Sequence, residues 1–403
     1  MKALFWVQHL LGIGHVRRAQ ALTRALLARD VQIVVVQGGQ DVPGQDFGGA
    51  RIIRLPAVRA ADAEFSGLVD SQGNPAGDSL LEERKTRLLA AYDEIRPDIV
   101  ITESFPFGRR ALRGELLPLL EAASAQTPKT QAPRPLIIAS IRDVLVAKSQ
   151  RKKEQWMADT ARRYYDGVII HGDPKLISLD QTFPFVEQLG NLLFYSGYIA
   201  SVDKRPNAVR TSRPGDIVIS AGGGAVAGPL YSATLSAIEP VGIELAGIEM
   251  AGIDAARWRF LVGPDMPVEE RKTAIDRAKA MTANVAIEPA VPDLAACLAG
   301  ARLSISQAGY NTVMDILRSG IRALVVPFAA GGESEQTIRA KALAERGRLT
   351  CLDESDTTSP TRFADAIRTV WSAPEPDPVA LAMNGADKAA DHIIDLVREK
   401  RSG

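Results

Sequence analysis

Short runs of valine, isoleucine and leucine alternate along this chain with longer segments that carry apolar residues at helical spacing. Such runs are typical of strands buried on both faces, and the amphipathic segments between them are typical of helices that cover a sheet. The alternation therefore predicts an α/β architecture with parallel sheets. Because 403 residues exceed the usual size of one compact domain, we expect two such sheets.

The strand-like runs fall into two groups on either side of a polar stretch. The first group predicts strands at about 3–7, 31–37, 99–102, 135–141 and 167–171. The second group predicts strands at about 216–220, 258–262, 285–288, 302–306, 323–328 and 349–352. The stretch 201–215 between them lacks apolar periodicity and is rich in turn residues, which indicates a linker.

These groups predict an N-terminal domain over residues 1–200 and a C-terminal domain over residues 216–375, each a doubly wound, Rossmann-like sheet. A final helix at about 379–400, in the segment 376–403, is expected to pack back across the first domain. One helix is expected near His15, and Ser79 with Glu82 forms a capping-box pattern that predicts the start of another.

Composition excludes several classes of protein. The 48 basic residues balance the 48 acidic ones, so no overall charge attracts nucleic acid. The only cysteines, Cys297 and Cys351, stand apart from any CxxC or Cys/His cluster, which disfavours a disulfide framework and a zinc site. No apolar run approaches the roughly 20 residues of a membrane span. We expect a soluble, cytoplasmic protein that at most rests on the inner face of a membrane.

The loops after the strands are where ligands bind in open α/β sheets. The first such loop, Gly12-Ile13-Gly14-His15, places an imidazole at the start of a helix, where it can act as a base. Glu103 and Asp143 follow neighbouring strands and could orient His15 or replace it. The alternatives remain that the glycines only form the turn, that His15 only stabilises it, and that both acids are ordinary loop carboxylates.

A glycine-rich loop, Ser220–Ala225, opens the second group of strands. Its amides at Gly222, Gly223 and Gly224 are suited to cradling a phosphate. Together with Ala227 the loop also matches the G-x-G-x-x-A pattern of dinucleotide-binding domains. That interpretation is disfavoured because no acidic residue ends a second strand about 20 positions later.

Two more loops of the second half carry polar groups at helix starts. In the segment 306–315 the residues of interest are Ser306, Gly309, Asn311, Thr312 and Asp315. Free amides at this helix start can hold an anion, and the carboxylate of Asp315 can accept hydrogen bonds from sugar hydroxyls, although it could also be a surface residue.

The loop 327–336 ends in Glu335 and Gln336, which offer the acceptors and donors needed to read the hydroxyl groups of a hexose. Helix capping by Ser334, with Glu335 stabilising the helix dipole, is the alternative.

The stretch 142–163 is locally basic, with Trp156, Tyr164 and Tyr165 interleaved among its arginines and lysines. Such a helix could rest on an anionic lipid surface or bind an acidic acceptor. A solvated helix face is the simpler interpretation.

Taken in order, these segments resemble the GT-B glycosyltransferases, most closely the MurG-like branch that transfers N-acetylglucosamine from a UDP donor. The resemblance covers nearly the whole chain and implies two facing Rossmann-like domains with a nucleotide-sugar in the cleft between them. It implies the following roles: Gly12–His15 facing the acceptor with Gly14 at the donor, Ser220–Ala225, Ser306, Gly309, Asn311 and Thr312 at the diphosphate, Val291 in the loop 289–292 at the base, Asp315 at the ribose, and Glu335 with Gln336 at the sugar.

The chain departs from the family pattern in ways that leave substrates open. The paired amides have become Glu335-Gln336, which leaves the sugar undefined, and the ribose acid is Asp315 instead of Glu, which could admit another base. The N-terminal half matches only in its first loop, so the acceptor, lipid-linked, anionic or neither, stays open.

The resemblance implies inverting transfer of a hexose or N-acetylhexosamine to an acceptor hydroxyl, with His15 as general base and UDP as leaving group. We expect no cofactor and no metal, since no Asp-x-Asp motif occurs in a suitable loop. The string Gly12–Arg18 is also similar to the first loop of PseG-type UDP-sugar hydrolases, in which the histidine would activate water instead.

Overall fold

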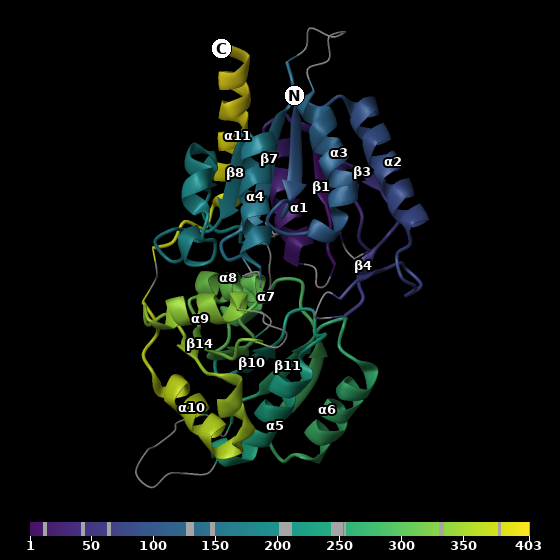
Figure 1. Cartoon of the computed structure of the whole chain (residues 1–403). Helices are drawn as coiled ribbons and strands as arrows, with labels where there is room; N and C mark the ends of the chain where they lie inside the picture. Colours follow the sequence, from purple (N-terminus) through teal and green to yellow (C-terminus); the bar gives the residue numbers. More distant parts are fainter. Residues whose placement is uncertain are drawn as a thin grey trace. The chain divides into compact units, whose positions relative to one another are not determined.

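The computed structural model describes residues 1–10, 14–41, 45–62, 66–125, 133–145, 150–200, 212–242, 253, 255–329, 334–377 and 380–402. The chain divides into two compact units (Figure 1). Unit 1 comprises Met1–Ile199 and Leu381–Gly403, and unit 2 comprises Ala200–Ala380. Most of the expected linker, residues 201–211, lies outside the described residues.

Unit 1 is built on a seven-stranded parallel sheet with the order β3-β2-β1-β6-β7-β8-β9. Its strands are β1 (Lys2–Val7), β2 (Gln32–Gln37), β3 (Arg51–Arg54), β6 (Ile99–Glu103), β7 (Leu136–Arg142), β8 (Gly167–His171) and β9 (Leu193–Tyr195). Its helices are α1 (Gly14–Leu27), α2 (Asp78–Ile95), α3 (Arg113–Ser124), α4 (Arg151–Tyr164) and α11 (Gly385–Ser402). A small antiparallel pair, β4 (Arg59–Ala60) and β5 (Leu68–Val69), stands outside the sheet.

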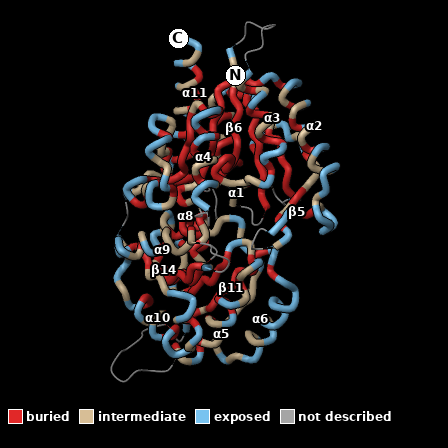
Figure 2. The backbone as a smooth tube through the Cα atoms, in the orientation of Figure 1, coloured by how far each residue is buried: buried red, intermediate tan, exposed pale blue. Residues whose placement is uncertain are grey.

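Alternate residues of β1 show how the sheet of unit 1 is covered on both faces. Leu4 and Trp6 belong to a core that α2, α3 and α4 cover, whereas Ala3, Phe5 and Val7 belong to a core that α1 and α11 cover. The strands are accordingly buried throughout the sheet interior (Figure 2). This two-sided burial explains why the strands have continuous apolar sequences.

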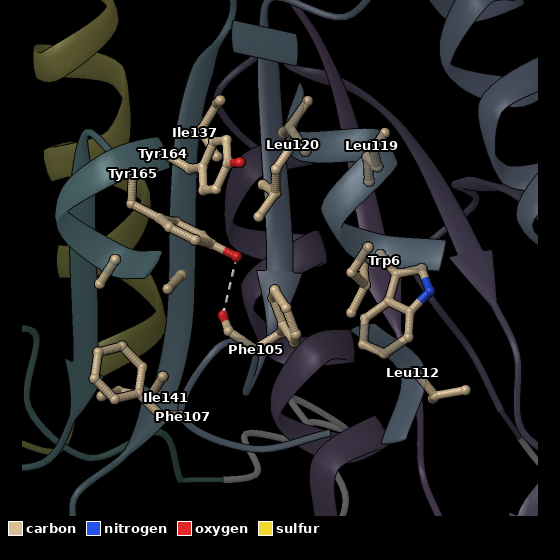
Figure 3. Packing of buried hydrophobic residues seen from close by; sticks show 14 of the residues in the cluster. Trp6, Phe105, Phe107, Leu112, Leu119, Leu120, Ile137, Ile141, Tyr164 and Tyr165 are labelled. Carbon is tan, nitrogen blue, oxygen red and sulfur yellow. Dashed lines mark hydrogen bonds between the residues drawn. The ribbon is translucent and has the colours of Figure 1, made fainter. Parts of the chain in front are cut away.

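The first of these cores is closed near the end of β6 by aromatic side chains (Figure 3). Phe105 meets Trp156 of α4 edge to face at 5.9 Å between ring centroids. The hydroxyl of Tyr165 donates to the carbonyl of Phe105 at 3.2 Å. Tyr164 is also buried in this core, so the aromatic residues of the basic stretch pack inward. These aromatic side chains therefore contribute to the core of unit 1.

The C-terminal helix α11 packs on unit 1, as the sequence predicts, through contacts with α1. Arg29, two residues after the end of α1, donates from Nε to Asp391 at 2.6 Å, and Ala389 and Ala390 are buried. The helix begins at Gly385, later than expected. A Cβ at Gly385 would lie 2.2 Å from the carbonyl oxygen of Gly197, so only glycine allows the two segments to approach this closely.

Unit 2 contains a six-stranded parallel sheet with the order β12-β11-β10-β13-β14-β15. Its strands are β10 (Ile217–Ser220), β11 (Trp258–Val262), β12 (Val285–Pro289), β13 (Leu303–Ser306), β14 (Arg322–Val325) and β15 (Thr350–Cys351). Its helices are α5 (Gly228–Gly242), α6 (Val268–Ala280), α7 (Leu294–Leu298), α8 (Tyr310–Ser319), α9 (Glu335–Ala344) and α10 (Pro360–Ser372). Helices α5 and α10 pack together on a core that includes Phe260 and Phe363.

The expected strands are all present, and the doubly wound fold class is confirmed for both units. Strands β3 and β9 at the sheet edges and the β4–β5 pair were not predicted. The capping-box prediction at Ser79 is wrong: α2 begins at Asp78 after Gly77, which makes no side-chain cap bond. Tertiary packing of Leu88, Ala91 and Ile95 fixes this helix instead.

Candidate functional site

The switch point of each sheet is the place where successive connections turn in opposite directions, and ligands bind there beyond the strand ends. In unit 1 the switch point lies between β1 and β6, and in unit 2 between β10 and β13. His15 lies in the first turn of α1, directly after the segment that follows β1, and Glu103 is the last residue of β6. Two predicted residues thus meet at the switch point of unit 1.

His15 and Glu103 form a close, shielded pair. Nδ1 of His15 lies 2.5 Å from Oε1 of Glu103, and the side chains are 12% and 2% exposed. Nδ1 also lies 2.9 Å from Nη2 of Arg18, which can only donate, but the contact with the carboxylate, which can only accept, is shorter. We therefore assign the proton to Nδ1, which leaves Nε2 as the basic nitrogen. Oε1 also accepts from Oγ of Ser104 at 2.9 Å and from Nη2 of Arg18 at 3.3 Å.

The surrounding charges keep the imidazole neutral. Burial lowers the pKa of His15 to about 3; Glu103 opposes this shift, whereas Arg109 and Arg18 add to it. Burial alone would raise the pKa of Glu103, but His15, Arg109 and Arg18 together hold the pKa of this carboxyl below its ordinary value. At neutral pH the pair is therefore a carboxylate and a neutral ring that can accept a proton.

The segment after Glu103 has an uncommon backbone conformation. Ser104 has φ of 65° and Arg109 has φ of 57°, both in the left-handed region that non-glycine residues rarely adopt. Such conformations cost on the order of 1–3 kcal/mol each and cluster at functional sites. Arg109 turns back to β1, where its Nε donates to the carbonyl of Gln8 at 2.9 Å. A guanidinium is thereby held within electrostatic range of the pair.

A buried ion pair fixes the end of β1 from the other side. Arg84 donates from Nε and Nη2 to the carboxylate of Glu115, each at 2.8 Å, and from Nη2 to Oε1 of Gln8 at 2.9 Å. The indole of Trp6 donates to Glu115 at 3.0 Å. Because every member is buried and bonded, the network holds Gln8 rigidly, and Gln8 in turn holds Arg109.

Asp143, the third predicted catalytic residue, directly follows β7 and is fully buried. Its Cβ packs against Gly172, where an added Cβ would lie only 2.5 Å away. On the next strand, His171 is buried between two hydroxyls, with Nε2 2.7 Å from Ser140 and Nδ1 3.1 Å from Ser196. Burial and Arg18 lower the pKa of His171 to about 3, against a raising effect of Glu103.

The glycine turn of unit 2 follows β10. Gly222 and Gly224 have φ of 56° and 94°, and a Cβ at Gly224 would lie 3.2 Å from the backbone of Gly263. Gly223 lies between them, and its carbonyl accepts from the amide of Asp265 at 2.9 Å. The turn therefore requires glycine, and it leaves a backbone surface in front of α5 that a ligand can approach.

Two serine hydroxyls lie side by side at this switch point. Ser220 ends β10 and Ser306 ends β13, and the two residues are register partners. Both hydroxyls are buried and have no hydrogen-bond partner in the described part of the chain. Gln307 ties the turn to β13 by donating to the carbonyl of Val226 at 2.8 Å. Unsatisfied buried hydroxyls at this edge are suited to donate to an oxyanion.

The remaining predicted residues of α8 lie close to this edge. Gly309 is the N-cap of α8 and offers no side chain to its first amides, the arrangement of a helix start that can hold an anion. Asn311 and Thr312 lie in the first turn. Asp315 is buried one turn further on, with Arg318 3.9 Å away.

Val291 and the sugar-reading pair lie on other loops of unit 2. Val291 is half-buried after β12, the edge strand on the far side of β11. Glu335 accepts from Nη2 of Arg339 at 2.8 Å, and Oε1 of Gln336 accepts from the amide of Phe328 at 3.1 Å. Both side chains therefore already have partners within unit 2. Ser334 is the N-cap residue of α9 but makes no side-chain cap bond.

Gly14, predicted at the donor, begins α1 in unit 1, whereas the other predicted donor residues belong to unit 2. Gly12 and the glycines at 331 and 332 lie outside the described residues. The sequence interpretation missed Arg18, Ser104 and Arg109. Arg18 stands three residues after His15, on the same helix face, and Arg109 ends the loop after Glu103, so spacing could have indicated both.

Within the described ranges, no group of His, Cys, Asp or Glu side chains is arranged to hold a metal ion. In the same part of the chain, no helix has the length and apolar character that crossing a membrane requires.

Residues 259–395 match the glycosyltransferase family 28 C-terminal domain. The structure also aligns over nearly its full length with solved GT-B glycosyltransferases. The chain is MurG-like and has the GT-B fold. The expected family resemblance and fold are thereby confirmed.

Among curated proteins, the chain is similar to the UDP-N-acetylglucosamine--N-acetylmuramyl-(pentapeptide) pyrophosphoryl-undecaprenol N-acetylglucosamine transferase of Ralstonia nicotianae. The two are 32% identical over 130 residues, which is 30% of this chain and 35% of the relative. The match therefore spans about a third of the curated relative.

The structural similarity extends over whole chains at low sequence identity. MurG of Acinetobacter baumannii aligns with a TM-score of 0.59 and 16% identity, covering 99% of this chain and 100% of that protein. The spinosyn rhamnosyltransferase SpnG aligns with a TM-score of 0.59 and 18% identity, covering 100% of both chains. At these identities the MurG-like fold is shared, whereas substrates must be argued from the site.

Proposed function

We propose that the chain is a glycosyltransferase that moves a hexose or N-acetylhexosamine from a UDP-sugar to an acceptor hydroxyl. The transfer proceeds with inversion and without a metal ion, and His15 removes the acceptor proton. The observation that carries the proposal is the shielded His15–Glu103 pair at the switch point of unit 1. A neutral imidazole with an ordered proton on Nδ1 is the equipment of a general base.

Glu103 acts through His15. It holds the ring in one orientation and tautomer, and it stabilises the imidazolium that forms when Nε2 takes the proton. The hydroxyl of Ser104 keeps the same carboxylate oxygen in place. Asp143 is buried at the neighbouring strand end, and in this proposal it is a second acid that orients the base.

Unit 2 supplies the donor site. Uncharged hydrogen-bonding groups lie at the carboxyl-terminal ends of β10 and β13, where they can bind the leaving diphosphate. They are the turn at Gly222–Gly224, the hydroxyls of Ser220 and Ser306, and the start of α8. Such fixed dipoles stabilise developing negative charge without a cation. Asp315 then serves the ribose and Val291 the base, and Glu335 with Gln336 lies toward the sugar.

The relatives support the donor class and a place of action. The curated relative is named as a transferase that uses UDP-N-acetylglucosamine and an undecaprenol-linked acceptor. We extend to this chain the nucleotide-sugar donor and action in the cytoplasm at the inner face of the membrane. We do not extend the acceptor of the relative to this chain, because the matched segment 259–395 lies mostly in unit 2.

A ligand screen followed by a turnover assay tests the proposal. Thermal melts of the full chain with UDP-sugars, other nucleotide-sugars and NAD should show stabilisation by a UDP-sugar and none by NAD. UDP release should then depend on an added hydroxyl acceptor, and NMR of the product should show the inverted anomeric configuration.

Two results would contradict the proposal in different ways. Stabilisation by NAD alone would replace the donor assignment with a dinucleotide site. Release of free sugar at a rate that no acceptor improves would make the chain a PseG-like UDP-sugar hydrolase with the same histidine acting on water.

A further inference from the structure

A second histidine of unit 1 has no part in the proposed proton transfer. His9 is the second residue after β1, and it is 8% exposed. Its Nδ1 is buried and has no hydrogen-bond partner in the described part of the chain. Burial and, to a smaller extent, the charge of Arg109 lower the pKa of the ring, so the imidazole is neutral at neutral pH. A neutral imidazole carries one N–H donor and one lone pair that accepts.

The ring is seated on a glycine of the neighbouring strand end. Gly39 lies two residues after β2, the strand that pairs with β1. An added Cβ at Gly39 would lie 2.3 Å from Nδ1 and from Cε1 of His9, and 2.9 Å from Nε2. Only glycine leaves room for the ring in this place. The ring therefore has a fixed seat, in which Nδ1 is sealed inside the chain.

The sealed nitrogen decides which tautomer is present. A proton on Nδ1 would be a buried donor without an acceptor, and orphaned N–H groups are rarer in proteins than orphaned acceptors. Of the two ring nitrogens of His9, only Nδ1 is buried without a partner within the described residues. We therefore assign the proton to Nε2, which makes the open edge of the ring an uncharged donor. This is the reverse of His15, whose Nε2 is assigned as an acceptor.

His9 and His15 are linked through Arg109. The charge of Arg109 lowers the pKa of both rings, so both lie within its electrostatic range. Nε of Arg109 donates to the carbonyl of Gln8, and Nε2 of Gln8 donates to the carbonyl of His9 at 2.7 Å. These bonds fix the backbone of His9 relative to the segment after β6. The two imidazoles therefore belong to one polar edge of unit 1, one as a donor and one as an acceptor.

We infer that His9 is a specificity-determining residue, whose Nε2–H donates to an uncharged oxygen of the acceptor next to the hydroxyl that His15 deprotonates. The acceptor class is then a compound in which a second hydroxyl, ether or carbonyl oxygen lies beside the reacting hydroxyl. This inference rests on the proposed transferase function and deepens it by naming a second contact to the acceptor. A ligand held at two atoms presents one hydroxyl to the base in a fixed orientation, which a water molecule cannot match.

The first experiment observes the ring in the full chain. NMR of the ring nitrogens at neutral pH, with His9 assigned by comparison with His9→Phe, should show the Nε2–H tautomer. Addition of 2-methoxycyclohexanol, whose ether oxygen can only accept, should shift the Nε2 resonance. Cyclohexanol, which lacks the second oxygen, should shift it less. A proton on Nδ1 of His9, or an equal response to both probes, overturns the inference.

The second experiment measures what the contact does for transfer. UDP release by the wild-type chain should have a KM about three- to tenfold lower for 2-methoxycyclohexanol or 1,2-cyclohexanediol than for cyclohexanol, because one neutral hydrogen bond contributes on that order. His9→Phe keeps a ring on Gly39 but loses the donor, so it should abolish the difference through KM. His9→Gln keeps an N–H donor and should retain part of the difference.

A pair of glycine variants tests the seat of the ring without changing the histidine. Gly39→Ala should displace the ring and reduce the KM difference to about that of His9→Phe. Gly114→Ala is the matched control, because a Cβ at this position in α3 meets no atom within 4 Å. It should leave the difference unchanged. A full KM difference in Gly39→Ala would contradict the seat of the ring and with it the inference.

The inference and the proposed function fail in different ways. Equal KM values for all three probes in the wild-type chain would overturn the role of His9 while UDP-sugar transfer stands, and this result does not depend on whether any variant folds. A response of the His9 ring to 2-methoxycyclohexanol, without turnover of UDP-sugars with any hydroxyl acceptor, would support the contact and contradict the transferase function.

Discussion

The segment after β6 in unit 1, Glu103–Arg109, and the turn after β10 in unit 2, Ser220–Ala227, both follow a central strand at a switch point. The first contains the buried carboxylate of Glu103, which accepts from Arg18, and it holds Ser104 and Arg109 in left-handed conformations. The second is built from glycines, small residues and uncharged hydroxyls. The same position in two similar sheets is thus equipped in opposite ways.

The difference teaches how the two units divide the chemistry. Backbone amides and hydroxyls have fixed dipoles that do not change with pH, so they suit the holding of an anion. A buried imidazole with a carboxylate and arginines nearby has a protonation state that its surroundings control. All four histidines, His9, His15, His171 and His392, lie in unit 1, and residues 200–380 contain none. In the proposed function, proton transfer is accordingly assigned to unit 1 and diphosphate binding to unit 2.

Removing the base should give the largest effect and the sharpest separation of the two roles. His15→Ala should reduce acceptor-dependent UDP release by about 10²- to 10⁴-fold, because general-base catalysis contributes on that order. UDP affinity, measured by calorimetry, should change less than about twofold. His392→Ala is a matched control. His392 lies in α11, stacks on Phe194 with 3.7 Å between the ring centroids, and has no part in the site. A loss of UDP affinity in His15→Ala would contradict the assignment of the base to unit 1 and of UDP binding to unit 2.

Mild acid should destabilise unit 1 more than unit 2. The pKa of His15 and of His171 is about 3 in the folded chain, below the ordinary 6.5 of an unfolded histidine. Between pH 6.5 and 5 the unfolded chain binds protons that the folded chain does not, so the free energy of unfolding falls as pH falls. For two such histidines the loss in unit 1 is about 3 kcal/mol.

Hydrogen exchange resolves the two units in one sample. Amides in the sheet of unit 1 should lose protection between pH 6.5 and 5, after correction for intrinsic exchange, while those in the sheet of unit 2 keep theirs. Unit 2 is the internal control, because residues 200–380 contain no histidine. Equal loss of protection in both units would show that the histidines do not govern the stability of unit 1.

The two regions also differ in how far the sequence alone could predict them. The turn Gly222–Gly224 was recognisable because positive φ and close approach leave a trace as consecutive glycines. The central strands were recognisable because burial on both faces leaves continuous apolar runs. Edge strands β3 and β9 are partly exposed and short, so they carry no such pattern.

The charged residues of unit 1 were less predictable. His15 and Glu103 could be proposed from their places after strands, but the arginines could not be chosen from 48 basic residues without knowing which are buried. The strain at Ser104 and Arg109 depends on tertiary contacts such as the bond from Arg109 to Gln8. The ion pair between Glu335 and Arg339 likewise depends on tertiary packing, although their i,i+4 spacing was visible in the sequence.

Replacing the one buried acid of α8 tests whether unit 2 also depends on a charged side chain. Asp315→Asn should weaken UDP binding about 10- to 100-fold, since a hydrogen bond to a charged group contributes about 1.5–3 kcal/mol. Arg318→Gln is the control for the loose 3.9 Å ion pair with Asp315 and should change UDP affinity little. Unchanged UDP affinity in Asp315→Asn would show that the ribose role lies elsewhere.

The smallest effect should come from adding one methyl group to the glycine turn. Gly224→Ala forces a side chain onto a residue with φ of 94° and places a Cβ 3.2 Å from Gly263, so the turn must shift. We expect UDP affinity to fall about 5- to 30-fold, equivalent to about 1–2 kcal/mol of left-handed strain and displaced amides.

Gly320→Ala has a similar φ of 74° at the end of α8 but meets no neighbouring atom. Gly320→Ala should lower the melting temperature about as much as Gly224→Ala does. It should leave UDP binding intact, because strain at the end of α8 does not move the amides of the turn. Equal loss of UDP affinity in both variants would mean that backbone geometry after β10 has no special part in binding, and the contrast with the side-chain site of unit 1 would fail.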